Sequence, residues 1–240
     1  TDDSVITPLS GDVRYGGWGR MTSNATVYSS SSMSSSSGSL SKGEGVTVIW
    51  YDDTAAYINY SSTSTSNGKF GYIRRSTVSL DPATDVGIVI TASSTYYDTN
   101  YTHRAGSVSQ GEYVSLISRA NGWDYIEYNV SGGKRKCAFV PSSCINHQYG
   151  TAREYHFFSV DQHAAAVDNY TTVYAGPDDR YYPEIGYVTQ NDTAANGKPM
   201  YSYFGLYNGN GEPMVFVSYQ TSSGTKYGWI KFYHYWYLNM

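Results

Sequence analysis

The stretch of residues 38–73, GSLSKGEGVTVIWYDDTAAYINYSSTSTSNGKFGYI, decides the fold. Apolar side chains recur at every second position over residues 46–50 and again over residues 56–60, which is the period of a β-strand. A turn separates these two segments, and the hairpin dipeptide Asn67-Gly68 precedes a third apolar segment. The stretch therefore predicts three strands joined by turns.

The stretch recurs 68 residues further along the chain, as GSVSQGEYVSLISRANGWDYIEYNVSGGKRKCAFV at residues 106–140. Gly38 corresponds to Gly106 and Tyr60 to Tyr128, whereas the next turn is one residue shorter in the second copy. The residue types of the predicted strands are similar in both copies, whereas the length of one turn differs. A period of this size therefore indicates one small domain that has been copied.

A third, looser copy occupies the C-terminal part of the chain. Residues 215–219 and 226–230 resemble the second and third strands of the first copy. We expect residues 185–188 to form the first central strand of this copy and the enlarged segment 191–212 to hold an extra hairpin. The sequence as a whole predicts an all-β protein of tandem small barrels. The predicted parts are an irregular lead-in at 1–24, units at 25–80 and 81–145 (the latter with its preceding connector), a linker or packing insert at 146–171, and a third unit at 172–240.

Composition limits the partners of the chain. The 27 tyrosines and the abundance of serine, threonine, glycine and asparagine favour strands and turns over helices. A net charge of −4 without a basic run argues against nucleic acid, and no apolar run approaches the length of a membrane span. The serine-rich, lysine-poor and nearly cysteine-free composition suggests a secreted or surface protein of bacteria. The start at Thr1 is expected of a processed or truncated product.

Two strand motifs of each copy resemble the bacterial SH3 (SH3b) family. The first copy has YINY at residues 57–60 followed by KFGYI at 69–73. In that family, a strand similar to WYKV is followed by a turn and a strand similar to GKxGWV. The second copy shows the first motif best, NGWDYI at 121–126, and the third shows the second motif best, KYGWI at 226–230. The resemblance covers most of residues 25–240 as three copies.

The resemblance implies tandem small SH3-like β-barrels, which are usually appended to exported proteins or cell-wall enzymes. Many members of the family bind peptidoglycan. Two departures bear on this expectation. Cys137-Ala138 stands where the family has a lysine-to-glycine step, and Ala55 stands where the second copy has Trp123. We therefore expect the first unit either to bind differently from the second or not to bind at all.

We found no residues that predict catalysis. Neither Cys137 nor Cys144 begins a helical pattern, as the nucleophile of a wall peptidase would. These two cysteines, seven residues apart, form either a local disulfide or two buried thiols, and the sequence leaves both readings open. The adjacent carboxylates at 52–53 and 178–179 have the turn positions of solvated aspartates. The spacing of His147, His156 and His163 matches no recognised metal motif, so we expect no metal site. With no catalytic residues predicted either, we expect no enzyme activity and no cofactor.

The expected recognition surface is aromatic. Tyr57 and Tyr125 lie off the Ile58 and Ile126 face by alternation, and an amphipathic ring suits stacking on sugars or glycyl backbones. The competing interpretation is that these rings pack the barrels. The candidate ligand-binding residues are Trp123, Tyr125, Tyr57, Tyr72, Phe216 and Trp229.

The predicted function is non-catalytic binding of peptidoglycan or another cell-wall glycan. One alternative is a structural rod or an interaction module whose partner is another protein. Another is the wall-targeting part of a larger hydrolase.

Overall fold

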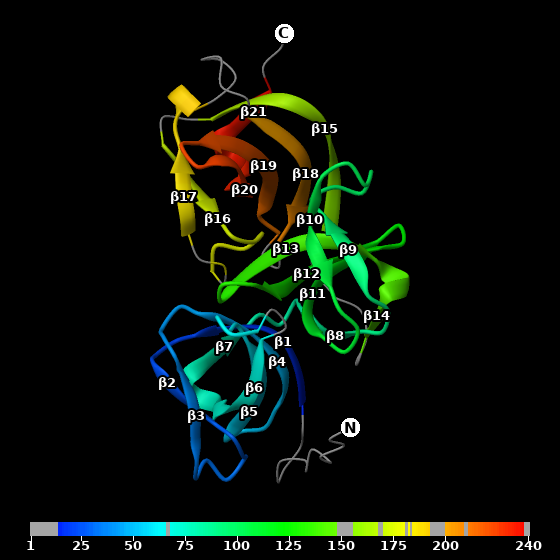
Figure 1. Cartoon of the computed structure of the whole chain (residues 1–240). Helices are drawn as coiled ribbons and strands as arrows, with labels where there is room; N and C mark the ends of the chain where they lie inside the picture. The colour runs from blue at the N-terminus through cyan, green and yellow to red at the C-terminus, as the bar shows by residue number, and fades with distance from the viewer. Residues whose placement is uncertain are drawn as a thin grey trace. The chain divides into compact units, whose positions relative to one another are not determined.

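The computed structural model describes residues 14–65, 68–147, 156–167, 170–180, 182, 184–192, 200–208 and 211–237. Within these residues the chain forms three seven-stranded sheets, which we call the first, second and third barrel (Figure 1). Every strand pairing is antiparallel, so the prediction of an all-β protein of tandem barrel-like units is confirmed. The first two barrels together form one compact unit, and the third barrel belongs to a separate one.

Each barrel contains seven strands. The first contains β1 (Arg14–Met21), β2 (Ala25–Tyr28), β3 (Ser36–Leu40), β4 (Gly45–Tyr51), β5 (Ala55–Tyr60), β6 (Lys69–Arg74) and β7 (Val78–Leu80). The second contains β8 (Asp85–Val89), β9 (Ser93–Tyr96), β10 (Arg104–Val108), β11 (Tyr113–Ala120), β12 (Trp123–Val130), β13 (Lys134–Pro141) and β14 (Ile145–His147). The third contains β15 (His156–Val167), β16 (Thr171–Tyr174), β17 (Glu184–Val188), β18 (Tyr201–Tyr207), β19 (Pro213–Thr221), β20 (Gly224–Lys231) and β21 (Tyr235–Tyr237). Short 3-10 turns are η1 (Arg75–Thr77), η2 (Ser142–Cys144), η3 (Gln190–Asp192) and η5 (Phe232–His234).

The three barrels share one strand order. The orders are β3-β2-β6-β5-β4-β1-β7, β10-β9-β13-β12-β11-β8-β14 and β17-β16-β20-β19-β18-β15-β21. The pairing of the two central strands also shifts at the same place in each barrel, after Val48, Leu116 and Ser202. A bulge bends a strand locally, so its repetition shows that each copy curls in the same way.

The first and third barrels begin one strand earlier than predicted, whereas the first strand of the second barrel lies within the predicted unit and its connector. Residues 14–21, which we expected to be part of an irregular lead-in, form β1, which pairs with β4 and β7. The connector before the second barrel contains β8, and the expected linker at 146–171 contains β15, which pairs with β18 and β21.

Close backbone approach explains why β1 did not look like a strand. A Cβ at Gly16 would lie 2.5 Å from the carbonyl oxygen of Val48, and a Cβ at Gly19 would lie 2.8 Å from Cγ2 of Val78. Glycine is therefore required where β1 crosses the neighbouring strands. The same glycines remove the alternation by which a strand is recognised in the sequence.

The third barrel is assembled differently from the prediction. Residues 184–188 form β17, an edge strand equivalent to β3, rather than the first central strand. That central place is taken by β18, which lies in the segment where we expected an extra hairpin and which pairs with β15 and β19. Tyrosines and glycine interrupt the aliphatic pattern of β18, so its central position was not evident from the sequence.

The aliphatic side chains of the strands fill the inside of each barrel. In the first barrel the buried core is Met21, Val27, Leu40, Val46, Val48, Ala56, Ile58, Tyr60, Ile73 and Val78. In the third it is Val167, Val173, Val188, Met200, Val215, Val217, Tyr219 and Ile230. Tyr60 and Tyr219 therefore belong to the core, as the packing interpretation expected.

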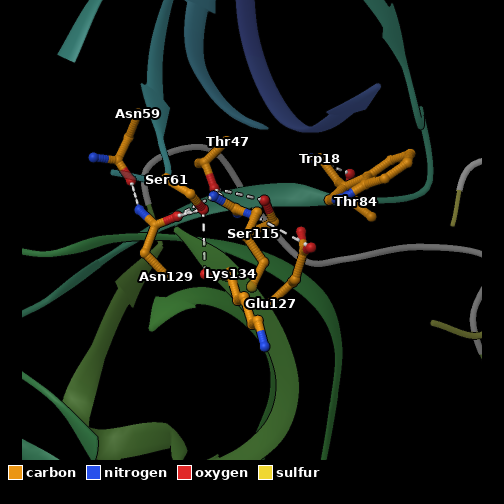
Figure 2. Close-up of polar contacts among 10 residues, drawn as sticks. Trp18, Thr47, Asn59, Ser61, Thr84, Ser115, Glu127, Asn129 and Lys134 are labelled. Carbon is orange, nitrogen blue, oxygen red and sulfur yellow. Dashed lines mark hydrogen bonds and ion pairs between the residues drawn. The ribbon is translucent and has the colours of Figure 1, made fainter. Parts of the chain in front are cut away.

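Equivalent strands of the first two barrels face each other. β1 contacts β8 and β11, and β4 contacts the same two strands. Since β1 corresponds to β8 and β4 to β11, this reciprocal pattern is that of a two-fold interface. The hydroxyls of Thr47 and Ser115, which are equivalent residues, lie 2.8 Å apart and are buried (Figure 2). The two copies thus meet through the same face.

Polar contacts cross this interface between the first two barrels. Ser61 donates a hydrogen bond of 2.9 Å to Oδ1 of Asn129, and the amide of Asn129 donates to Asn59 (Figure 2). Arg135 donates to Oδ1 of Asn129 at 2.7 Å and forms an ion pair of 3.1 Å with Glu127. Both side chains of this ion pair are only 8% exposed. Buried polar groups need such partners, so these contacts define one relative arrangement of the two barrels.

Candidate aromatic binding site

Aromatic residues occupy three equivalent positions in every barrel. In the first barrel Tyr57 lies opposite Tyr72 across the β5–β6 ladder, and Tyr72 lies opposite Tyr28 of β2. The corresponding rows are Tyr125, Phe139 and Tyr96 in the second barrel, and Phe216, Trp229 and Tyr174 in the third. Five of the six predicted site residues thus lie in these rows, and Trp123 is the exception. Each row spans three neighbouring strands, which brings its rings within reach of one another.

The aromatic row lies on the opposite face of the sheet from the aliphatic core. In the first barrel Ile58 belongs to the core, whereas its neighbour Tyr57 packs against a separate cluster that contains Trp50, Tyr72 and Ile49. Successive side chains of a strand point to opposite faces, so the sequence pattern predicted this division. The cluster is therefore a second hydrophobic cluster, on the other face of the sheet from the aliphatic one.

Four aromatic rings of the first barrel contact one another in its cluster. The ring centroid of Tyr57 lies 5.3 Å from that of Trp50, 4.8 Å from that of Tyr72 and 6.0 Å from that of Phe70. The rings of Tyr57 and Phe70 are within 22° of parallel. Phe70 is 42% exposed and Tyr57 is half-buried, so the cluster reaches solvent through these two rings.

A tyrosine of the second barrel joins this cluster. Tyr113, at the start of β11, packs against the cluster, and its ring centroid lies 5.9 Å from that of Phe70 in an edge-on arrangement of 81°. Burial raises the pKa of Tyr57 to about 12, and the neighbouring phenols of Tyr72 and Tyr113 add to this shift. The three phenols therefore share one poorly solvated region.

The second barrel has an equivalent cluster of aromatic rings. Tyr125 and Phe139 lie 4.8 Å apart between ring centroids, and Trp123 meets Phe139 edge-on at 6.4 Å. Trp123 also meets Tyr96 edge-on at 6.3 Å. Tyr125 is 1% exposed, whereas Trp123 is half-buried. Ring surface is therefore open to a ligand at Trp123 and closed at Tyr125.

The two predicted rings of the third barrel are buried within its cluster. Phe216 lies 5.3 Å from Trp229 and 5.2 Å from Phe204 between ring centroids. Tyr227 stacks on Phe216 at 6.0 Å within 18° of parallel. Phe216 is 3% exposed and Trp229 is fully buried. These two rings support the cluster and present no surface of their own.

The six predicted residues therefore belong to equivalent clusters but differ in accessibility. Tyr57 and Trp123 keep part of their surface exposed. Four others are buried, namely Tyr72, Tyr125, Phe216 and Trp229. Sequence reasoning missed Trp50, Phe70 and Tyr113. Of these, Phe70 had a detectable signal, because it lies two residues before Tyr72 and hence on the same face of its strand.

The two cysteines do not form a disulfide. Cys137 and Cys144 are both free and buried, so of the two readings the buried thiols hold. Cys137 lies on β13 opposite Glu127, whereas Cys144 lies in the turn η2 that follows. Burial and the charge of Glu127 raise the pKa of the Cys137 thiol well above its usual value. A buried neutral thiol is a poor nucleophile, so Cys137 acts as a packing residue.

The adjacent aspartates hold turns. Asp52 accepts hydrogen bonds of 2.7 Å from the backbone amides of Thr54 and Ala55. Burial alone would raise the pKa of Asp52, but these hydrogen bonds lower it below its ordinary value. Asp178 is fully buried and accepts a hydrogen bond of 2.9 Å from Nε of Arg180. Both carboxylates have structural partners.

Metal ligands do not cluster in the described part of the chain. None of its residues form a group of three or more His, Cys, Asp or Glu side chains suited to hold a metal ion. The side chains of His147, His156 and His163 lie outside the described part.

Similarity to known proteins is weak. No protein-family model matches the sequence, and no curated protein matches it. Among solved structures, NlpC1 from Trichomonas vaginalis is 12% identical with a TM-score of 0.27, over 95% of this chain and 96% of that chain. NlpC2 from the same organism is 12% identical with a TM-score of 0.26, over 91% and 97%. Superposition at this level is too poor to support a common fold or function.

Within the described residues, no helix combines the length and the apolar character that crossing a membrane requires.

Proposed function

We propose that the chain is a non-catalytic binding protein of the bacterial SH3 type, secreted or held at the cell surface, that recognises peptidoglycan or another cell-wall glycan. One observation carries the proposal. An aromatic cluster recurs at equivalent positions in all three barrels, on the face of the sheet opposite to the core. An aromatic cluster that recurs on the same face in all three copies is expected of a binding surface.

The aromatic cluster of the first barrel is separate from the aliphatic cluster inside it. The ten buried residues of the aliphatic cluster include neither Trp50, Tyr57 nor Tyr72. Aromatic rings that remain partly exposed, such as Phe70, cost solvation. Exposed rings with a polar rim suit sugars, because a pyranose has an apolar face and hydroxyls around its edge.

Tandem barrels compensate for weak individual sites. Burying one aromatic face of about 100 Å² contributes about 2.5 kcal/mol. Two such contacts give roughly millimolar binding once association costs are subtracted. Several barrels on one repeating polymer raise the apparent affinity by a factor of about 10²–10⁴. A tandem chain is therefore most useful on a repetitive target such as a wall polymer.

The buried polar interface between the first two barrels favours a second candidate function. Thr47 and Ser115 are buried at its centre, and a buried ion pair adds to it. A pair of barrels with a defined arrangement could serve as a rigid spacer or as a surface for another protein. A wall-targeting role within a longer hydrolase is compatible with either candidate.

Co-sedimentation of the chain with purified peptidoglycan sacculi tests the proposal. The test variants are Trp123→Ala and Phe70→Ala, which remove partly exposed rings of the second and first barrel. Tyr233→Ala is the control, because Tyr233 is 70% exposed and belongs to no cluster described above. We expect the parent and control to sediment and the two test variants, shown to be folded, to bind less. A parent chain that stays in solution contradicts wall binding and favours the protein-interaction candidate.

A further inference from the structure

We propose that the first barrel has a composite binding platform, completed by the second barrel, that accepts the ring face of an uncharged glycan. The composite platform consists of Tyr57 and Phe70 from the first barrel and Tyr113 from the second. The inference rests on the proposed function and adds to it the barrel that binds, the residue that completes the site and the part of the wall polymer that is recognised.

The composite platform contains one stacked pair of rings and one ring that stands edge-on to it. Tyr57 and Phe70 are near-parallel, with centroids 6.0 Å apart, and Tyr113 stands edge-on to Phe70 at 5.9 Å. Trp50 and Tyr72 support Tyr57 from behind, at 5.3 and 4.8 Å. A ring held by such neighbours loses little conformational freedom when a ligand arrives, which lowers the cost of binding.

The composite platform is open where a ligand would need it. Phe70 is 42% exposed, and Tyr57 and Tyr113 are half-buried, whereas the supporting rings of Trp50 and Tyr72 are only 7% and 9% exposed. The accessible rings therefore form the surface and the inaccessible rings its base. This distribution is that of a binding site and not of a core.

The second barrel lacks a reciprocal platform even though the interface follows a two-fold pattern. Gly45 is the residue of the first barrel that corresponds to Tyr113. A Cβ at Gly45 would lie 3.6 Å from Oε1 of Glu127 and 3.6 Å from Cδ of Arg135, so the buried ion pair occupies the reciprocal place. Cys137 also stands where the first barrel has Phe70. The pair of barrels therefore carries one composite site.

The chemistry of the composite platform selects a neutral sugar. None of the five rings of the platform and its base is charged, and the polar atoms they offer are phenol hydroxyls and one indole N–H. A peptide would bring a row of backbone donors and acceptors that need partners, which rings cannot supply. A pyranose presents an apolar C–H face to a ring and directs its hydroxyls to the rim, where water or phenol groups satisfy them. The glycan strand of the wall polymer is therefore the favoured ligand.

Titration with a soluble tetramer of β-1,4-linked N-acetylglucosamine, followed by NMR on the whole chain, tests the inference. We expect Tyr113→Ser to weaken binding of the tetramer by at least about tenfold, which corresponds to about 1.4 kcal/mol. Tyr113→Phe keeps the ring and is expected to bind like the parent. Phe70→Ser provides a second variant outside the barrel–barrel interface core, and Tyr233→Ser is the exposed-tyrosine control.

Each outcome separates the inference from the proposed function. Sacculi that bind the parent and Tyr113→Ser equally well overturn the composite platform but leave wall binding intact. A chain that binds neither sacculi nor the tetramer overturns both. Binding of pentaglycine in place of the tetramer, with shifts at the same rings, overturns the glycan assignment in favour of a peptide.

Discussion

Replacing Arg135 by alanine is predicted to weaken the unit formed by the first two barrels. Arg135 donates 2.6 and 2.7 Å hydrogen bonds to Thr47 and Asn129, and it forms the buried ion pair with Glu127. The substitution leaves the carboxylate of Glu127 buried among groups that no longer neutralise it. Removal of one partner of a buried ion pair costs about 3–5 kcal/mol, because a lone charge remains out of water.

The cost of Arg135→Ala depends on pH in a defined direction. Burial raises the pKa of Glu127, although Arg135 opposes that shift, so loss of the arginine raises the pKa further. The folded chain then holds this proton more tightly than the unfolded chain. The contribution of the group to stability is therefore fully present below the unfolded pKa and is lost as pH rises through the folded pKa. The variant should lose more stability at pH ~8 than at pH ~5.

Urea unfolding of the full chain at these two pH values measures the effect. Arg14→Ala is the matched control, because Arg14 also pairs with a carboxylate, Asp53, but the two side chains are 50% and 91% exposed. An exposed pair contributes little, so the control should unfold like the parent. A loss of less than about 1 kcal/mol in Arg135→Ala, equal at both pH values, would refute the reasoning that Glu127 is a buried charge in need of this partner.

A Cβ added at Gly45 would lie 3.2 Å from Nε1 of Trp18, so Gly45→Tyr should lower the stability of the first barrel by about 1–3 kcal/mol in thermal unfolding. An unchanged midpoint argues against close packing there. Because burial raises the pKa of Tyr57 to about 12, its contribution to stability should be present below pH ~10 and disappear as pH rises to about 12. Phenolate absorbance checks this, and a Tyr57 that titrates with the exposed tyrosines contradicts it. Both thiols, Cys137 and Cys144, should react with a thiol reagent in urea but not in the folded chain, whereas the absence of free thiols in urea would indicate a disulfide.

Alternation along the strands made much of the fold predictable. It identified the central strands of the first two copies and placed Tyr57 and Ile58 on opposite faces, as the structure has them. It could not identify β1, where Gly16 and Gly19 permit close backbone contact and erase the pattern. It also misplaced the central strand of the third barrel, since β18 has Ser202 where the other copies have Val48 and Leu116.

The candidate site was predictable in kind but not in extent. Aromatic positions could be matched between copies, yet their exposure depends on neighbours far away in the chain. Tyr113 lies 43 residues beyond Phe70 in the sequence, and nothing local indicates that the two rings meet. Likewise Thr47 and Asn59 have the appearance of solvent-facing strand residues, whereas both are fully buried. Such contacts depend on how two copies meet, which period and propensity do not encode.

The meeting of Thr47 with Ser115 bears on the history of the chain. A single ancestral barrel that paired with its own twin through this face would have carried identical residues on both sides of the axis. Tyrosine at both 45 and 113 would have clashed with the groups packed around position 45, and glycine at both would have removed the ring that joins the aromatic cluster at position 113. Fusion of the twins into one polypeptide removes that constraint, because each position then mutates alone. Covalent duplication thus gives a homodimer the freedom to specialise its two halves.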